Sequence, residues 1–182
     1  MNDRLPSKKR ALDLLFQSGC SPEIVEHCKT VAEVATELAE ACRKKGLDVD
    51  VELVEIGALL HDIGRSETHS VHHAIIGAEI ATSLNLPNEI VAIIERHVGG
   101  GITSEEAEKL GWPVKDYLPQ TWEEKIVSYA DKLIDGSKRV SIQRTIRKFS
   151  KKIPQSSIDG LKSLHEEFSS LIGDFDVHRD TT

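Results

Sequence analysis

Residues 56–64 read Ile56-Gly57-Ala58-Leu59-Leu60-His61-Asp62-Ile63-Gly64, and the fold prediction starts from this stretch. The apolar run before His61 is typical of a buried helix, which places the adjacent His61 and Asp62 at the edge of the core. Neighbouring residues on a continuing helix point about 100° apart. Gly64 permits a tight exit from the helix, because glycine adopts backbone conformations closed to other residues. We therefore predict a helix that ends at this motif and presents both polar side chains to one site.

Helical periodicity extends outward from this stretch in both directions. Ser21-Pro22 is a helix start signal, and capping boxes at Thr103 and Thr121 mark two more N-termini. No alternating run is long enough to predict a sheet, so the sequence indicates an all-α, single-domain helical bundle. Its helices are expected at about residues 8–17, 22–45, 51–60, 72–84, 89–97, 104–110, 122–134, 142–150 and 156–172.

Composition narrows the class of protein. The 182 residues are 39% hydrophobic and 29% charged, which suits one soluble globular domain. A net charge of −7 and an aromatic content of 4% disfavour nonspecific nucleic-acid binding. No apolar run approaches the roughly 18–20 residues of a membrane span, and the N-terminus lacks a signal-peptide layout. The three cysteines form no Cys-x-x-Cys pair, so we expect reduced thiols in a cytoplasmic protein.

Five of the eight histidines lie in the middle of the chain, and carboxylates accompany them. Asp131 is expected on an otherwise apolar helix face, where an unpaired carboxylate is costly. Mixed nitrogen and oxygen donors suit a divalent transition metal such as Fe, Mn, Ni, Co or Zn. Six donors exceed what one catalytic ion needs, so we expect two ions that share a bridging carboxylate. The six candidate ligands are His27, His61, Asp62, His73, His97 and Asp131.

A second interpretation applies to His73 and His97. Each stands at the end of a predicted helix, and a histidine near a helix C-terminus is favoured by the helix dipole. In that interpretation the two residues cap helices, and the remaining four donors hold a single ion.

The order of these donors on an all-α chain resembles the HD-domain metal-dependent phosphohydrolases, and His61-Asp62-Ile63-Gly64 is the motif that names their HDIG subgroup. His73-Ala74-Ile75-Ile76-Gly77-Ala78 and Arg96-His97 are similar to the extended version, which is associated with dinuclear sites. The resemblance covers about residues 22–136 and is closest to archaeal HDIG-domain proteins of undefined substrate. Only 11 residues separate His61 from His73, fewer than in dinucleoside polyphosphate hydrolases, which puts that substrate in doubt.

The resemblance implies an HD-type helical core at residues 21–136. A packing N-terminal helix (1–20) precedes it, and C-terminal helices with a basic segment and a frayed tail follow it (137–182). It further implies hydrolysis by a metal-bound hydroxide, because a bound ion lowers the pKa of water to about 7. In this assignment Asp62 bridges two ions; the first is held by His27, His61 and Asp131, and the second by His73 and His97.

Other polar residues near the ligands are candidates for substrate contacts. Arg65 and Lys132, each next to a ligand, could neutralise phosphate charge, or be solvated surface charges. His69 or His72 could protonate the leaving group, since imidazole titrates near neutral pH, or lie in a surface loop.

Three further features have more than one interpretation. Residues 138–152 hold seven basic side chains and no acidic one; they could steer an anionic substrate, contact RNA or form a solvated face, which we favour. Gly99-Gly100-Gly101 could cradle a phosphate, although a flexible loop is the favoured interpretation. Trp112, Tyr117 and Trp122 would form a pocket wall or a homodimer contact.

The sequence thus predicts a metal-dependent phosphohydrolase that acts on a nucleotide or another small phosphate ester, with no membrane partner and no nucleic-acid partner favoured. A cyclic-nucleotide phosphodiesterase is the nearest alternative among enzymes. A non-catalytic nucleotide- or RNA-binding module with a structural metal is the alternative from another class.

Overall fold

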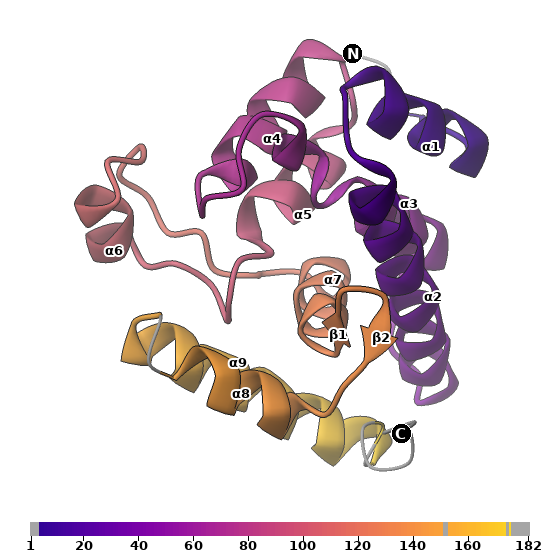
Figure 1. Ribbon diagram of the computed structural model, residues 1–182. Coiled ribbons are helices and arrows are strands. Elements are labelled where there is room, and N and C mark those ends of the chain that lie inside the picture. The colour runs from indigo at the N-terminus through magenta and orange to yellow at the C-terminus, as the bar shows by residue number, and fades with distance from the viewer. Residues whose placement is uncertain (1–3, 151–152, 174, 176–182) are drawn as a thin grey trace.

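The computed structural model describes residues 4–150, 153–173 and 175, and their fold is all-α as predicted (Figure 1). The tail that was expected to fray lies almost wholly outside the described residues. The helices are α1 (Lys8–Gln17), α2 (Pro22–Lys44), α3 (Val51–Leu60), a 3-10 turn η1 (Ile63–Ser66), α4 (His73–Ser83), α5 (Asn88–Arg96), α6 (Ser104–Lys109), α7 (Trp122–Lys132), α8 (Ile142–Phe149) and α9 (Gln155–Ile172).

Local capping signals explain where most of these helices begin. Ser21 accepts a hydrogen bond from the Ile24 N–H and so caps α2, with proline at the first helical position. Thr103 and Glu106 form the reciprocal capping box expected at α6. At α7 only half of the predicted box forms: Thr121 caps the helix, but the Glu124 side chain turns away to Arg96 and Gln120.

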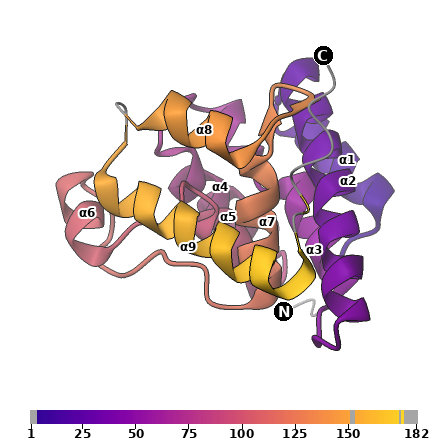
Figure 2. The same ribbon diagram turned by 90° about the horizontal axis from the view of Figure 1, so that it is seen from below.

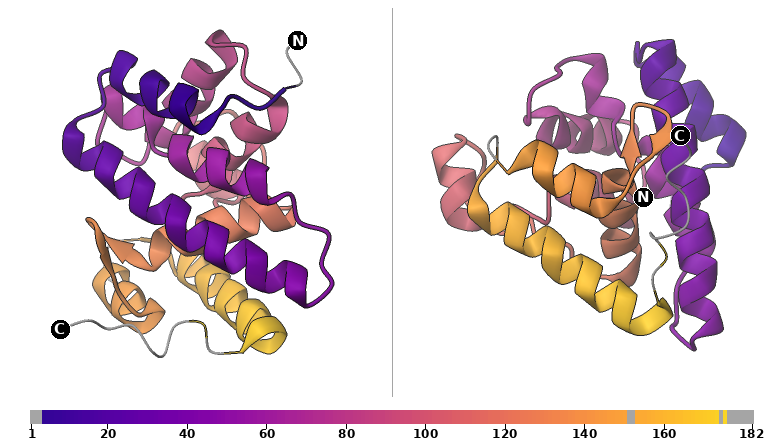
Figure 3. Two further views of the ribbon diagram at one scale, coloured as in Figure 1. Left: turned by 90° about the vertical axis from the view of Figure 1, so that its right-hand side faces the viewer. Right: turned by 60° about the horizontal axis from the view of Figure 1, so that its bottom comes forward.

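The core lies between α2, α3, α5 and α7. α2 packs along both α3 and α7, and it crosses the whole face of the molecule, with α1 on one side and α9 on the other (Figure 3). α3 is apolar almost all round, since its neighbours α1, α2, α5 and α7 cover it. His61 ends α3 at 0% exposure, so the predicted placement of the motif beside the core is confirmed.

A short antiparallel hairpin, which the sequence did not predict, joins α7 to α8. Strand β1 (Ile134–Asp135) pairs with β2 (Lys138–Arg139). Strands of two residues are too short to show alternation in a sequence, and the turn between them contains Gly136 at a positive φ of 65°.

The glycine run at 99–101 is a packing surface and not the flexible loop that was favoured. α9 passes so close to it that a Cβ on Gly160 would lie 2.6 Å from the Gly100 carbonyl oxygen. Figure 2 shows α9 running past α7 with α8 beside it. The glycines therefore let α9 approach, which brings the C-terminal helices over the end of α5.

The aromatic residues also separate. Trp112 and Tyr117 are buried against each other in a small hydrophobic cluster near α6, whereas Trp122 packs against Phe168 of α9. These three residues therefore do not form one joint pocket wall. The three cysteines are buried and unpaired, in agreement with the prediction of reduced thiols. Among the described residues no helix is long and apolar enough to cross a membrane.

Candidate metal centre

The six predicted ligands come from separate elements and converge on one place. His27 lies in α2, His61 and Asp62 follow α3, His73 begins α4, His97 follows α5 and Asp131 lies in the last turn of α7. Two overlapping sets of donor atoms can be distinguished, and within each set all donor atoms lie within 4.8 Å of one another. One set comprises His27, His61 and Asp131, and the other comprises His61, Asp62 and His97. The structure therefore brings the six residues together, and their role as metal ligands stays a prediction.

The first set surrounds one oxygen of Asp131. His27 Nε2 lies 3.1 Å and His61 Nε2 3.5 Å from Asp131 Oδ1. Asp62 Oδ2 lies 3.7 Å from both of these nitrogens. These four atoms leave a gap that one ion could fill.

His73 and His97 lie around the other oxygen of Asp62, Oδ1. His73 Nε2 lies 3.1 Å and His97 Nε2 3.5 Å from Asp62 Oδ1, and the two nitrogens are 3.0 Å apart. The two Asp62 oxygens therefore face different histidine pairs, which is the arrangement that a bridging carboxylate needs.

Backbone carbonyls fix the orientation of all four imidazoles. Each Nδ1 lies 2.6–2.7 Å from a carbonyl oxygen, and the partners are Gly136 for His27, Ala58 for His61, Ser70 for His73 and Ile94 for His97. An Nδ1–H that donates to a carbonyl leaves Nε2 as a free lone pair. A metal-bound histidine usually donates such a hydrogen bond from its other ring nitrogen, because the bond fixes the tautomer and raises the basicity of the ligating nitrogen.

The donor set fits a divalent metal, because it is unsatisfied without a cation. His61 Nε2 and Asp62 Oδ1 are buried and have no hydrogen-bond partner, an arrangement that costs free energy. The Nε2 lone pairs of His73 and His97 face each other at 3.0 Å and repel unless a cation or a further proton lies between them. Imidazole nitrogens with carboxylate oxygens suit Fe, Mn, Co, Ni or Zn.

The protonation states agree with this fit. Burial alone would raise the pKa of both aspartates, but the nearby histidines hold the pKa of Asp62 well below its ordinary value, and Lys132 and the histidines do so for Asp131. Burial lowers the pKa of His97 to about 4, so its imidazole is neutral at pH 7. Burial would also lower the pKa of His27, but the hydrogen bond to Asp131 and the charges of Asp131 and Asp62 raise it, so this imidazole favours a proton when no metal is bound. The ionised aspartates and the neutral His97 are in the state that binds a metal, whereas His27 would release a proton when an ion binds.

The two predicted phosphate-binding cations lie at this centre. Arg65 donates from Nε to Asp62 Oδ2 at 2.5 Å, and Lys132 Nζ pairs with Asp131 Oδ2. Both side chains are more than two-thirds buried (29% and 14% exposed), so neither is the solvated surface charge of the alternative interpretation. Lys132 and Arg65 line the wall of a cavity beside the ligands.

The candidate proton donors lie elsewhere. His72 is exposed and does not line the cavity; its Nδ1 accepts a hydrogen bond from Trp112 Nε1 at 2.8 Å. His69 is also exposed and outside the lining. The structure does not bring either imidazole to the centre, because the turn before α4 directs only His73 inward. We do not retain His72 or His69 as a proton donor.

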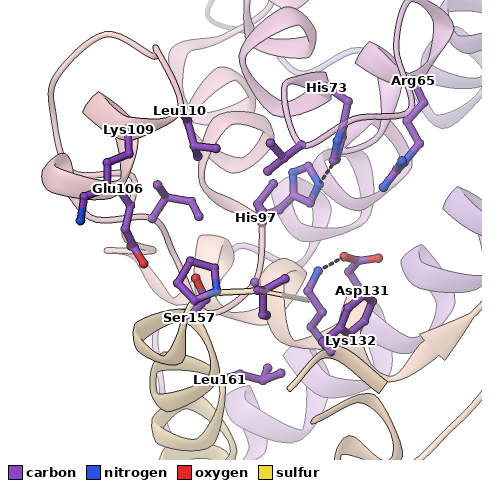
Figure 4. A pocket seen from close by; sticks show the side chains of 17 residues that line it. Arg65, His73, His97, Glu106, Lys109, Leu110, Asp131, Lys132, Ser157 and Leu161 are labelled. Carbon is purple, nitrogen blue, oxygen red and sulfur yellow. Dashed lines mark hydrogen bonds and ion pairs between the residues drawn. The ribbon is translucent and has the colours of Figure 1, made fainter. Parts of the chain in front are cut away.

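A cavity of about 350 Å³ opens from the metal centre toward the C-terminal helices. Figure 4 shows the ligand end, with His73, His97, Asp131, Arg65 and Lys132, opposite Glu106 and Lys109 of α6. Between the two ends the walls are largely apolar. The sequence did not predict these apolar walls. The residues of the C-terminal region that line them are Phe149, Ile153, Pro154, Ser157 and Leu161.

Surface ion pairs hold part of the basic segment. Arg139 pairs with Glu37 at 2.6 Å, and Lys148 pairs with Asp135 at 2.6 Å. Lys151 and Lys152 lie outside the described residues. The described cations of this segment are mostly exposed, in agreement with a solvated face.

Comparison of the sequence with known proteins identifies related proteins. The family model of the HD domain matches residues 24–135. The chain is 51% identical over 166 residues to the uncharacterized protein MJ0778 of Methanocaldococcus jannaschii, which covers 90% of this chain and 98% of that protein. It is 43% identical over 169 residues to a tRNA (cytidine(56)-2'-O)-methyltransferase of Picrophilus torridus, which covers 93% of this chain but only 48% of that relative.

Among solved structures, the HD domain of the L. monocytogenes phosphodiesterase PgpH, in complex with cyclic-di-AMP, has a similar fold. The TM-score is 0.50 at 20% sequence identity, over 95% of this chain and 99% of that chain. The sequence matches and the shared fold lead to one conclusion: the chain belongs to the HD domain family.

Proposed function

We propose that the protein is a metal-dependent phosphohydrolase with a dinuclear centre, and that it acts on a nucleotide or another small phosphate ester. One observation carries the proposal: the two oxygens of Asp62 face two separate histidine pairs, and all four imidazoles direct Nε2 toward this carboxylate. The neighbouring cavity has room for a small molecule, since sites of this kind range over about 300–1,000 Å³.

Some residues of the centre would hold the metal ions and others would bind the phosphate. His27, His61 and Asp131 would hold one ion and His73 and His97 the other, with Asp62 shared. When bound, such ions generate a nucleophile from water at neutral pH and stabilise charge on the phosphoryl oxygens. Arg65 and Lys132 would bind the remaining phosphate oxygens, because both line the cavity directly beside the ligand carboxylates.

Metal content and hydrolysis together test this proposal. Protein purified without chelator or affinity metal should contain about two equivalents of transition metal and hydrolyse members of a panel of phosphomonoesters, cyclic nucleotides and pyrophosphates. Asp62→Asn should keep the helical fold but lose metal and reduce hydrolysis by at least about a hundredfold. Asp48→Asn, at an exposed position, is the matched control. A folded Asp62→Asn variant with full activity would contradict the site assignment.

The similarity to a tRNA methyltransferase favours one second candidate, a phosphoester in RNA. In that case a short oligoribonucleotide should be hydrolysed faster than any mononucleotide, and product analysis would identify the bond. A purely structural metal predicts a third result: chelation unfolds the chain, and no phosphate ester is turned over.

A further inference from the structure

The cavity beside the metal centre has two chemically different ends. The ligand end contains the cations Arg65 and Lys132. The far end contains the Glu106 carboxylate, which is fixed in place because it accepts hydrogen bonds from Thr103 and from Ser156 of α9. Lys109 also lines the far end, but its side chain is 70% exposed and pairs with Glu105. The more buried cations Arg65 and Lys132 therefore make the ligand end the favoured one for a phosphate.

An apolar section separates these ends, and much of it comes from the C-terminal helices. Phe149 ends α8 and Ile153 lies in the connection to α9, and both line the cavity. Leu161 lines it from α9 (Figure 4). Ile102 and Leu110 line the side toward α6. These five side chains offer a stacking surface and apolar contacts but no hydrogen-bonding group.

We propose that this apolar section is a nucleobase subsite, and that the C-terminal helices select nucleoside phosphates over phosphate esters without a base. The inference rests on the proposed function, because the metal centre fixes which end takes the phosphate. An aromatic ring and aliphatic walls bind the flat apolar faces of a base, whereas a sugar phosphate would leave its hydroxyls unpaired there. A volume of about 350 Å³ lies within the range of sites that take one small molecule.

Much of the subsite lies outside the segment that matches the family model. That match ends at residue 135, and Phe149, Ile153 and Leu161 all follow it. The close contact of Gly160 with Gly100 sets the position of this wall, because it holds α9 against the turn after α5. Base recognition would thus come from a part of the chain that does not hold the metal.

Binding measurements test the subsite without relying on turnover. Calorimetric titration would compare AMP with inorganic phosphate, on metal-loaded and on chelator-treated protein. Phe149→Ala should weaken AMP binding roughly 5- to 150-fold, the range for loss of one base–aromatic stack, and leave phosphate binding unchanged within about twofold. Ile153→Ala should weaken AMP binding at least about threefold. Phe16→Ala, which removes an aromatic ring 57% exposed on α1, should have no effect.

Two results would overturn the inference: wild-type protein that binds AMP no more tightly than phosphate, or folded Phe149→Ala and Ile153→Ala variants that both keep wild-type AMP affinity. Circular dichroism of each variant identifies any loss of fold, and Ile153→Ala serves if Phe149→Ala does not fold. Hydrolysis of methyl phosphate separates the two proposals. If methyl phosphate is hydrolysed but AMP binding is not selective, only the subsite fails; if AMP binds selectively but no ester is hydrolysed, only the proposed function fails.

Discussion

The ion pair of Arg96 with Glu124 joins α5 to α7 directly beside the metal centre, and its removal should be measurable. Arg96 Nη1 donates to both carboxylate oxygens of Glu124 at 3.0 Å, and the Gln120 N–H donates to Oε2 at 2.7 Å. The Glu124 side chain is 6% exposed and that of Arg96 19%. Glu124→Ala would therefore leave a largely buried guanidinium, whose Nε already has no hydrogen-bond partner, and an unpaired backbone N–H.

Breaking a buried pair by removing one partner costs about 3–5 kcal/mol. The lower end, about 3 kcal/mol, applies here, because Arg96 is one-fifth exposed and Glu95 remains 3.6 Å from its Nε. In a chain of this length each kcal/mol shifts the melting temperature by about 2–4 °C, so Glu124→Ala should lower it by about 6–12 °C. Thermal unfolding followed by circular dichroism measures this directly.

The exposed pair of Lys109 with Glu105 provides the control. Both side chains are at least 70% exposed, so Glu105→Ala should change stability by no more than about 0.5 kcal/mol. Because Arg96 precedes His97, Glu124→Ala should also reduce the content of bound metal. If Glu124→Ala melts within about 2 °C of the wild type, the buried pair does not stabilise the contact between α5 and α7, and the reasoning is refuted.

Two further predictions concern packing and protonation. Gly160→Ala should destabilise the protein by about 1–2 kcal/mol in urea unfolding, because the new Cβ would lie 2.6 Å from the Gly100 carbonyl oxygen. Helix propensity alone predicts that alanine stabilises the protein by about 1 kcal/mol at this position. A measured gain of that size would exclude the close contact. The free energy of unfolding of chelator-treated protein should fall by up to about 3 kcal/mol as the pH falls from about 6.5 to 4. The reason is that His97 binds a proton over this range in the unfolded chain, whereas its pKa of about 4 keeps it neutral in the folded chain. His97→Gln should reduce this slope, and an equal slope in both proteins would argue against a buried neutral imidazole.

Local signals in the sequence were enough to predict most of the helices and which six polar residues converge. Caps such as Ser21 and Thr103 act within one turn, so the helix ends that they mark agree with the structure to within one or two residues. Asp131 could be recognised because a carboxylate on an apolar face needs a partner, and His27 and Lys132 now supply it. The direction of an imidazole was less predictable: His72 and His73 are adjacent, yet only His73 faces the centre.

The features that the sequence did not predict depend on contacts between segments that are distant in the sequence. The glycine run was interpreted as a flexible loop because its partner, Gly160, lies about 60 residues away and carries no motif. Glu124 looked like half of a local capping box, whereas its carboxylate is recruited by Arg96 from another helix. The apolar section of the cavity was missed for the same reason, since Phe149 and Leu161 meet it only after α9 docks.

The two interpretations of His97, as a helix cap and as a ligand, do not exclude each other. His61 ends α3 and His97 ends α5, and each Nδ1 contacts the carbonyl three residues earlier, Ala58 or Ile94. The last carbonyls of a helix have no N–H partner within the helix, so this one bond satisfies a carbonyl and leaves Nε2 free. Helix C-termini also carry partial negative charge, which favours a cation at that end. Placing a histidine at the C-terminus of a helix is therefore a direct way to orient Nε2 toward a metal, and His61 and His97 both have this arrangement at the candidate centre.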